Sequence, residues 1–331
     1  MSETRDPWSF ARVETVGTDS HPETEPYPPT DDGTGIRIGV MSDLHIEYEP
    51  TFWHETAGRS DRGDRGAAEL IRVRREHERE PGHPTAGPDL RGLKAAEIDL
   101  LLLAGDIGPG TDGAEYAAAA ARYLDCRTVY VAGNHEAWKR DLVANLADIR
   151  SICRASGGAV TFLENDRVTF AIGGRTVTIL GCTLWTDFRF GDQESASLTA
   201  AEMLTDYWVI EYGGHRFTPE IAQALHFASR AWLAREMPRA RFEADIVIVM
   251  THYPPLPNTS SPRHGDGLHA ASYTSDMTAE LANWRSDLCV WGHTHHRMRS
   301  RLGRTELVSA PRGFLGLEAG SENFVPVVIE L

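Results

Sequence analysis

Five short motifs carrying carboxylate, amide and imidazole groups lie in order along this chain. Four of them directly follow an apolar run that is typical of a β-strand, and the fourth motif in the chain follows residues 246–250 after one threonine. Open α/β sheets bind ligands at the carboxyl ends of their strands, so these side chains are expected to gather at one site. The motifs are Asp43-Leu44-His45, Gly105-Asp106, Gly133-Asn134-His135-Glu136, Thr251-His252 and Gly292-His293-Thr294-His295.

The donor set of these motifs indicates a metal site. Carboxylate, amide oxygen and imidazole suit divalent ions such as Mn²⁺, Fe²⁺, Zn²⁺, Ni²⁺ or Co²⁺. No cysteine is among them, so a structural zinc site of the cysteine type is not supported. Taken singly, each residue has a structural explanation as a cap, a turn or a hydrogen-bonded histidine. Their joint occurrence favours ligation, and the spacing of His293 and His295 points both imidazoles to one side of an extended segment.

The elements that must position these motifs alternate between strand and helix. Continuous apolar runs predict buried strands at residues 36–41, 98–103, 127–132, 245–250 and 287–291. Helices are predicted at 114–124, at about 138–156, 194–212 and 219–237, and near 277–284. Shorter strands are predicted at 160–163, 167–172, 175–180, 297–301, 304–309 and 324–330. Two such βα halves, each ending in shorter strands, predict an α/β protein in which two sheets pack face to face with helices outside.

Composition narrows the class of protein. With 33 basic and 48 acidic residues the net charge is −15, which does not favour non-specific binding to nucleic acid. No apolar run approaches the roughly 18–20 residues needed to cross a bilayer, and the start of the chain has no apolar signal segment. The four cysteines are far apart, as expected of free thiols in a reducing cytoplasm.

The domain organisation follows from the same composition. Residues 1–35 read as an acidic, proline-rich tail that is partly ordered at best, because they hold few apolar residues. Residues 36–331 read as a single domain. A polar, Arg/Glu-rich insertion occupies about residues 49–95 and could cover the site.

The five motifs resemble the calcineurin-like metallophosphoesterase superfamily, whose pattern is DxH, GD, GNHE, H and GHxH, over about residues 36–310. Within the superfamily, the chain resembles uncharacterised bacterial members. The resemblance implies a four-layer αββα sandwich of two mixed β-sheets flanked by helices, and a dinuclear metal centre. It further implies that His135 contacts the phosphate and is the general acid that protonates the leaving oxygen. The implied ligands are Asp43, His45 and His295 for one metal, Asn134, His252 and His293 for the other, and Asp106 between them.

One departure from the family pattern concerns the catalytic histidine. In the phosphoprotein-phosphatase branch the second motif continues as GDxxDRG, and its acid orients that histidine. Here Asp106 is followed by Ile107-Gly108-Pro109, so that partner is missing from this position. The departure argues against a protein Ser/Thr phosphatase.

Besides Asn134 and His135, two further residues are weaker candidates for substrate contact. Trp185, in the segment 183–188, could line a pocket, with core packing as the alternative because aromatic side chains are mostly buried. Arg312 could reach the substrate or pair with an acid of this chain.

The leading hypothesis is a metal-dependent phosphoester hydrolase of small molecules, with a lean towards phosphodiesters. A small-molecule phosphomonoesterase is the first alternative. A nuclease of the same superfamily would need a cationic track, whereas the arginines at 59–79 are interleaved with acids. A catalytically silent binding module would be expected to have lost a ligand or the catalytic histidine, and neither is lost here.

Overall fold

The computed structural model describes residues 35–49, 82–84, 86–189, 193–257, 259 and 268–331. Apart from Gly35, the predicted acidic tail lies outside these residues, as does most of the predicted insertion at 49–95. Within the described residues, no helix is both long enough and apolar enough to span a bilayer.

The first sheet has five strands in the order β13-β1-β2-β3-β4. Strands β1, β2, β3 and β4 are parallel, and β13 pairs antiparallel with β1. Buried apolar side chains fill β2 and most of β1 and β3, as expected of strands covered on both faces. The strands are β1 (Arg37–Met41), β2 (Leu100–Ala104), β3 (Arg127–Val131), β4 (Val160–Phe162) and β13 (Val327–Glu330).

The second sheet has six strands in the order β11-β12-β10-β9-β6-β5. Its four inner strands are parallel, while β5 and β11 at the edges are antiparallel to their neighbours, so both sheets are mixed. The strands are β5 (Asp166–Ile172), β6 (Arg175–Cys182), β9 (Ile246–Thr251), β10 (Leu288–Trp291), β11 (Met298–Leu302) and β12 (Thr305–Ser309), and a separate hairpin comprises β7 (Glu211–Tyr212) and β8 (His215–Arg216).

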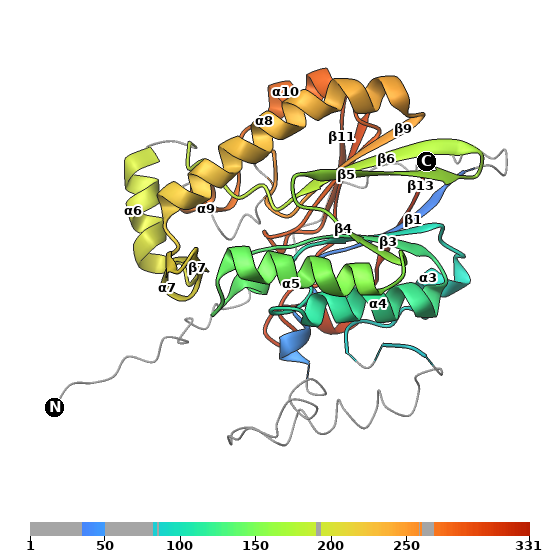
Figure 1. The fold of residues 1–331 in the computed structure, drawn as a ribbon, viewed down its shortest axis with the longest axis horizontal. Coiled ribbons are helices and arrows are strands. Elements are labelled where there is room, and N and C mark those ends of the chain that lie inside the picture. The colour runs from blue at the N-terminus through green and yellow to red at the C-terminus, as the bar shows by residue number, and fades with distance from the viewer. Residues whose placement is uncertain (1–34, 50–81, 85, 190–192, 258, 260–267) are drawn as a thin grey trace. The chain divides into compact units, whose positions relative to one another are not determined.

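The two sheets pack face to face and are flanked by helices, which confirms the predicted four-layer αββα sandwich (Figure 1). The inner core joins Val40 and Leu102 of the first sheet to Ile248 of the second, all fully buried. Burying each such side chain contributes about 1.5–3 kcal/mol. Helices α3 (Arg91–Ala95), α4 (Asp112–Leu124) and α5 (Leu142–Ala155) pack against the first sheet, and α6 (Gln193–Met203), α7 (Asp206–Val209), α8 (Pro219–Glu243), α9 (Leu268–Tyr273) and α10 (Thr278–Trp284) belong to the core of the second.

Three predicted helix boundaries were wrong. The helix expected at 138–156 begins only at Leu142, because the Asp141 side chain caps it by accepting the N–H groups of Val143 and Ala144. The stretch 194–212 is divided between α6 and α7. The chain bends between these two helices, and Asp206, the first residue of α7, is buried. Helix α8 continues through Pro238 to residue 243, because residues on both sides of the proline are buried in the core.

Candidate metal centre

The five sequence motifs leave the sheets at the same edge. Asp43, Asp106 and the Gly133 motif follow the parallel strands β1, β2 and β3, while His252 and the Gly292 motif follow β9 and β10. The backbone of these loops is unusual, since five non-glycine residues have positive φ angles between 45° and 71°. Such conformations cost of order ~1 kcal/mol or more and concentrate at functional sites. The five residues are Asp43, His45, Asp106, His293 and His295.

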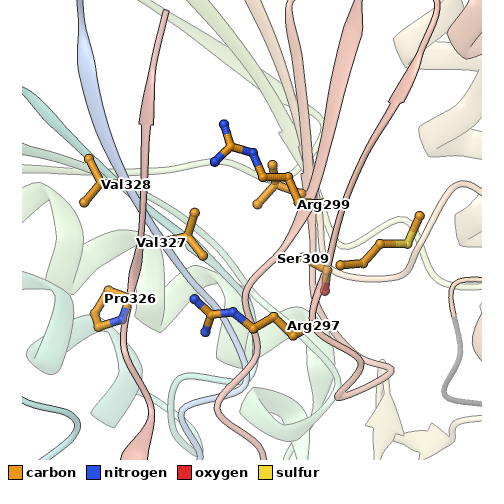
Figure 2. A pocket seen from close by; sticks show the side chains of 8 residues that line it. Arg297, Arg299, Ser309, Pro326, Val327 and Val328 are labelled. Atoms are coloured by element: carbon orange, nitrogen blue, oxygen red, sulfur yellow. The ribbon is translucent and has the colours of Figure 1, made fainter. Parts of the chain in front are cut away.

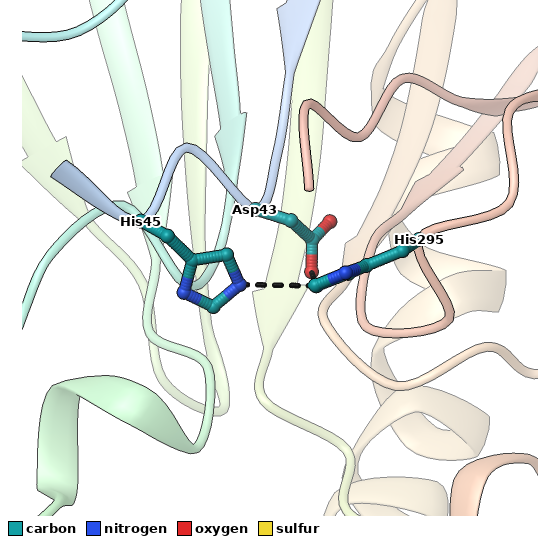
Figure 3. Close-up of side chains that lie close together, drawn as sticks. All are labelled: Asp43, His45 and His295. Carbon is teal, nitrogen blue, oxygen red and sulfur yellow. Dashed lines mark hydrogen bonds and ion pairs between the residues drawn. The ribbon is translucent and has the colours of Figure 1, made fainter. Parts of the chain in front are cut away.

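The first cluster consists of Asp43, His45 and His295 (Figure 3). Their donor atoms lie within 4.8 Å of one another, as the ligands of one ion would. The Nε2 atoms of His45 and His295 are 3.0 Å apart, and His295 Nε2 is 3.6 Å from Asp43 Oδ1. Two imidazoles and one carboxylate therefore converge on one point.

The second cluster consists of Asp106, His252 and His293, whose donor atoms also lie within 4.8 Å of one another. Asp106 Oδ2 is 3.4 Å from His252 Nε2, and the same oxygen is 3.8 Å from Nε2 of His45 in the first cluster. The side-chain oxygen of Asn134 is 3.1 Å from His252 Nε2. Asp106 thus lies between the two clusters, and Asn134 completes the second.

Two buried side-chain atoms in the clusters have no hydrogen-bond partner in the described part of the chain and could bind a divalent cation. Asp43 Oδ2 and His293 Nε2 are buried, and neither has a hydrogen-bond partner among the residues that the structure describes. A buried polar atom left unpaired costs about 1–3 kcal/mol. A bound cation would remove that cost at both atoms.

The histidines are also held in the way that metal-ligating histidines are held. His252 Nδ1 lies 2.9 Å from the carbonyl oxygen of Ala104, to which it donates, and His295 Nδ1 lies 2.7 Å from Glu318 Oε1. Each contact occupies Nδ1, so that Nε2 is the nitrogen that faces the cluster.

The electrostatics of the centre favour positive charge. Burial opposes the charged form of His252, but the carboxylates of Asp106 and Asp43 outweigh it and raise the pKa of His252 to about 9. His293 shows the opposite balance, because burial and the neighbouring His252 lower its pKa well below the usual value. The acids are thus arranged to stabilise a cation, while one imidazole stays neutral and available as a ligand.

Glu136 holds the loops of the centre together. Its carboxylate accepts the backbone N–H groups of Asp106, Ile107 and Gly133 at 2.7–3.1 Å and the hydroxyl of Tyr130 at 2.7 Å. Burial and the neighbouring Asp106 raise the pKa of the Glu136 carboxyl to about 7. The last residue of the GNHE motif is therefore a structural organiser, a role that the sequence did not reveal.

We predict that Glu136→Ala lowers the free energy of unfolding by about 3–5 kcal/mol, because it leaves buried donors without an acceptor. Urea denaturation in the presence of a chelator measures this loss without a contribution from bound metal. The exposed Glu202 of α6 provides the control, since Glu202→Ala should change stability by no more than about 0.5 kcal/mol. Equal stability of the two variants would refute the organising role.

The motif glycines are required by close approach. A Cβ on Gly133 would run into the side chains of Asp106 and His252, and one on Gly105, which also has a φ of 83°, would run into the His252 ring. Glycine at these two positions lets the second cluster close.

His135 lies beside the clusters with its ring held on two sides. It stacks on Trp138 with ring centroids 3.6 Å apart, and its Nδ1 lies 3.2 Å from Glu47 Oε1. The acid that the sequence pattern lacked after Asp106 is thus supplied by Glu47, two residues after His45, on the 3₁₀ helix η1 (Ile46–Tyr48). The position after Asp106 carries no such acid, as the sequence indicates, and a residue distant in sequence contacts His135 instead.

Asn134 has a partner that the sequence reading also missed. Its Nδ2 donates to Asp206 Oδ1 at 2.9 Å, and the same oxygen accepts Trp138 Nε1–H at 2.7 Å. Because the amide nitrogen of Asn134 faces Asp206, its side-chain oxygen faces His252. No motif marks Asp206 in the sequence.

The two weaker candidates both lie in the interior. Trp185 is 2% exposed and packs against Phe217 and Tyr253 in the core of the second sheet. Arg312 is buried in an ion pair with Glu49. Trp185 thus packs in the core and Arg312 pairs with an acid of this chain, which were the alternatives to substrate contact.

A cavity of about 370 Å³ lies between the edge strands β11 and β13 (Figure 2). Two arginines line it, but Arg297 donates to the carbonyl oxygen of Val325 at 2.8 Å and Arg299 pairs with Glu306 at 2.6 Å. None of the predicted site residues lines this cavity.

Comparison with known proteins gives a family match and several structures of similar fold. Residues 36–297 match the family model described as calcineurin-like phosphoesterase. The fold is similar to phosphopantetheinyl hydrolase from Mycobacterium tuberculosis (14% identity, 90% of this chain and 96% of that chain covered, TM-score 0.58). A dimetal phosphatase from Danio rerio is also similar (14% identity, 85% and 88% covered, TM-score 0.44). No curated protein matches the chain.

Proposed function

Because this chain belongs to the calcineurin-like phosphoesterase family, we propose that it hydrolyses small phosphodiesters at a centre of two divalent metal ions. The observation that carries the proposal is the position of the Asp106 carboxylate, whose Oδ2 lies within 3.8 Å of a histidine from each cluster. A carboxylate between two neighbouring cations reduces the electrostatic repulsion between them. The family makes the chain a phosphoester hydrolase, and the paired clusters support two ions.

The proposed ligands follow from the two clusters. When bound, two divalent ions polarise a phosphoryl group and neutralise its developing charge. Asp43, His45 and His295 would hold one ion, Asn134, His252 and His293 would hold the other, and Asp106, which lies between the clusters, would contribute to both.

The proposed proton donor is His135. Its Nδ1 is occupied by Glu47, so Nε2 is the nitrogen available to give a proton to the leaving oxygen. Stacking on Trp138 restricts rotation of the ring, and Asp206 in turn holds Trp138. The ring is thus set in place before substrate arrives, which lowers the entropic cost of proton transfer.

The preference for diesters rests on charge. A monoester dianion carries one more negative charge than a diester and benefits from additional cationic side chains. Arg312, which the sequence suggested could reach the substrate or pair with an acid, forms a buried ion pair with Glu49. The acidic net charge of −15 also disfavours the more highly charged substrate.

Metal content and substrate preference test the proposal together. Purified protein is analysed by mass spectrometry, and hydrolysis of bis-p-nitrophenyl phosphate and p-nitrophenyl phosphate is measured with Mn²⁺, Ni²⁺ or Zn²⁺ added. We expect about two metal ions per chain and faster cleavage of the diester. Two metals with monoester cleavage alone would make the protein a phosphomonoesterase, and the absence of both metal and activity would refute a hydrolytic function.

The contact between His295 and Glu318 gives a separate prediction for metal affinity. Glu318→Ala removes the carboxylate that fixes the His295 ring, so the affinity for metal should fall by roughly 10–100-fold. Competition with a chromogenic chelator measures the affinity. The exposed Glu322, nearby in sequence, is the control, and equal affinities of Glu322→Ala and Glu318→Ala would contradict the proposed ligand role of His295.

A further inference from the structure

Glu47 has a fixed position because the short helix that carries it is anchored at several points. The N–H of Ile46 donates to the carbonyl oxygen of Ile107 at 3.1 Å, and the Ile46 side chain is buried. The N–H of Tyr48 donates to His45 O at 2.9 Å, which closes the turn. The Glu47 side chain is only 15% exposed, so its carboxylate is confined to the site.

The Glu47 carboxylate contacts two histidines with one oxygen. Its Oε1 lies 3.2 Å from His45 Nδ1 and 3.2 Å from His135 Nδ1. The two rings meet edge to face, with centroids 4.3 Å apart. The carboxylate therefore links a proposed metal ligand to the proposed proton donor.

The contacts of His135 show which nitrogen this link leaves for chemistry. Trp138 covers one face of the ring at a centroid distance of 3.6 Å, and Glu47 accepts at Nδ1. Nε2 makes no hydrogen bond with any residue that the structure describes. With Nδ1–H donating to the carboxylate, Nε2 is the nitrogen left for the substrate, and the ring can give a proton from Nε2 when both of its nitrogens are protonated.

We propose that Glu47 is a positioning residue that holds His135 in the orientation needed to protonate the leaving oxygen of the substrate. This inference rests on the proposed function. Glu47 makes this contact from the segment that follows β1, whereas the position after the GD motif carries no acid in this chain. Its proposed action is through the His135 ring, and the metal content of the variant tests its second contact, with His45 Nδ1.

The dependence of the rate on the leaving group tests this role. A proton donor matters more for phenol, whose pKa is about 10 like that of the tyrosine side chain, than for the more acidic p-nitrophenol. We therefore expect Glu47→Ala to lower kcat for a phenyl methyl phosphodiester by roughly 10–100-fold, and for the p-nitrophenyl analogue by less than about 5-fold. Glu47→Gln keeps an oxygen acceptor for Nδ1–H and should retain more of the phenyl ester activity. The exposed Glu322→Ala should leave both rates unchanged.

A double-mutant cycle separates action through His135 from an independent effect. In the His135→Ala background, Glu47→Ala should cause no further loss, because the group that it positions is gone. Losses that multiply would overturn the proposal. A fall in metal content with equal loss for both esters would also overturn it, because Glu47 would then act through His45 on the first cluster.

The outcomes also separate this inference from the proposed function. If wild-type protein cleaves neither ester, the proposed function fails. If His135→Ala loses phenyl ester activity and Glu47→Ala keeps it, only the positioning role fails. Should Glu47→Ala not fold, as judged by circular dichroism, the leaving-group comparison and the cycle are carried out with Glu47→Leu, which also offers no acceptor to Nδ1–H. Unchanged phenyl ester activity of that variant would count against the role.

Discussion

Replacing His135 with alanine should lower kcat by roughly 10²–10⁴-fold and leave the metal content unchanged. The expectation follows from the position of the ring, which lies beside the metal clusters and is fixed by Trp138 and Glu47 rather than by the groups that converge on the proposed ions. Turnover of a phosphodiester and metal content by mass spectrometry are measured on the same sample. The loss should be larger for poor leaving groups than for p-nitrophenol.

An exposed histidine provides the control for this variant. His215 lies on the hairpin strand β8, and His215→Ala should leave both rate and metal content as in the wild type. The outcome that would refute the assignment is loss of metal from His135→Ala. His135 is also close enough to His45 and Asp106 to form a third possible metal group, and loss of metal would make it a ligand instead.

Replacing Asp106 with asparagine should remove at least one metal ion per chain and lower kcat/KM by more than the roughly 10–100-fold that follows loss of an outer-shell partner. Asparagine keeps an oxygen that can accept the His135 backbone N–H, as Asp106 Oδ1 does at 2.8 Å, so the loop should keep its conformation. It lacks the negative charge that lies between the two clusters. The loss would therefore report on charge rather than on folding.

Metal content and chelator competition measure this effect, and circular dichroism checks the fold. The exposed Asp148 of α5 is the control, and Asp148→Asn should behave like the wild type. An Asp106→Asn protein that holds two metal ions and retains the full rate would disprove the shared-ligand arrangement.

The architecture could be predicted because its determinants are local. Apolar runs such as residues 100–104 and 246–251 identify buried strands without reference to the rest of the chain. The chain order of these runs then places the motif residues at strand ends. Helix boundaries were less accurate, since the start of α5 depends on the Asp141 cap and the length of α8 on packing around Pro238.

The motif residues were identifiable from sequence for the same reason. Asp43 and His45 lie in one short segment, as do His293 and His295, and their spacing in a loop after a strand restricts where the side chains point. The clusters that the structure brings together, including the central position of Asp106, are made of these residues.

The residues that support the motifs were decided by tertiary structure. The contact between Glu47 and His135 spans 88 positions in sequence, and that between Asn134 and Asp206 spans 72. Each of these contacts forms only after two distant segments have packed. The side chain of Glu47 is then directed by η1, and that of Asp206 by the bend before α7. Arg312 likewise pairs with Glu49 only because the chain after β12 returns to the end of β1. The sequence by itself determined the donor groups and the strand ends that carry them, since both follow from short-range patterns. Only the packed structure decided which acid orients which ligand, because a hydrogen bond between distant segments has no signature in either one alone.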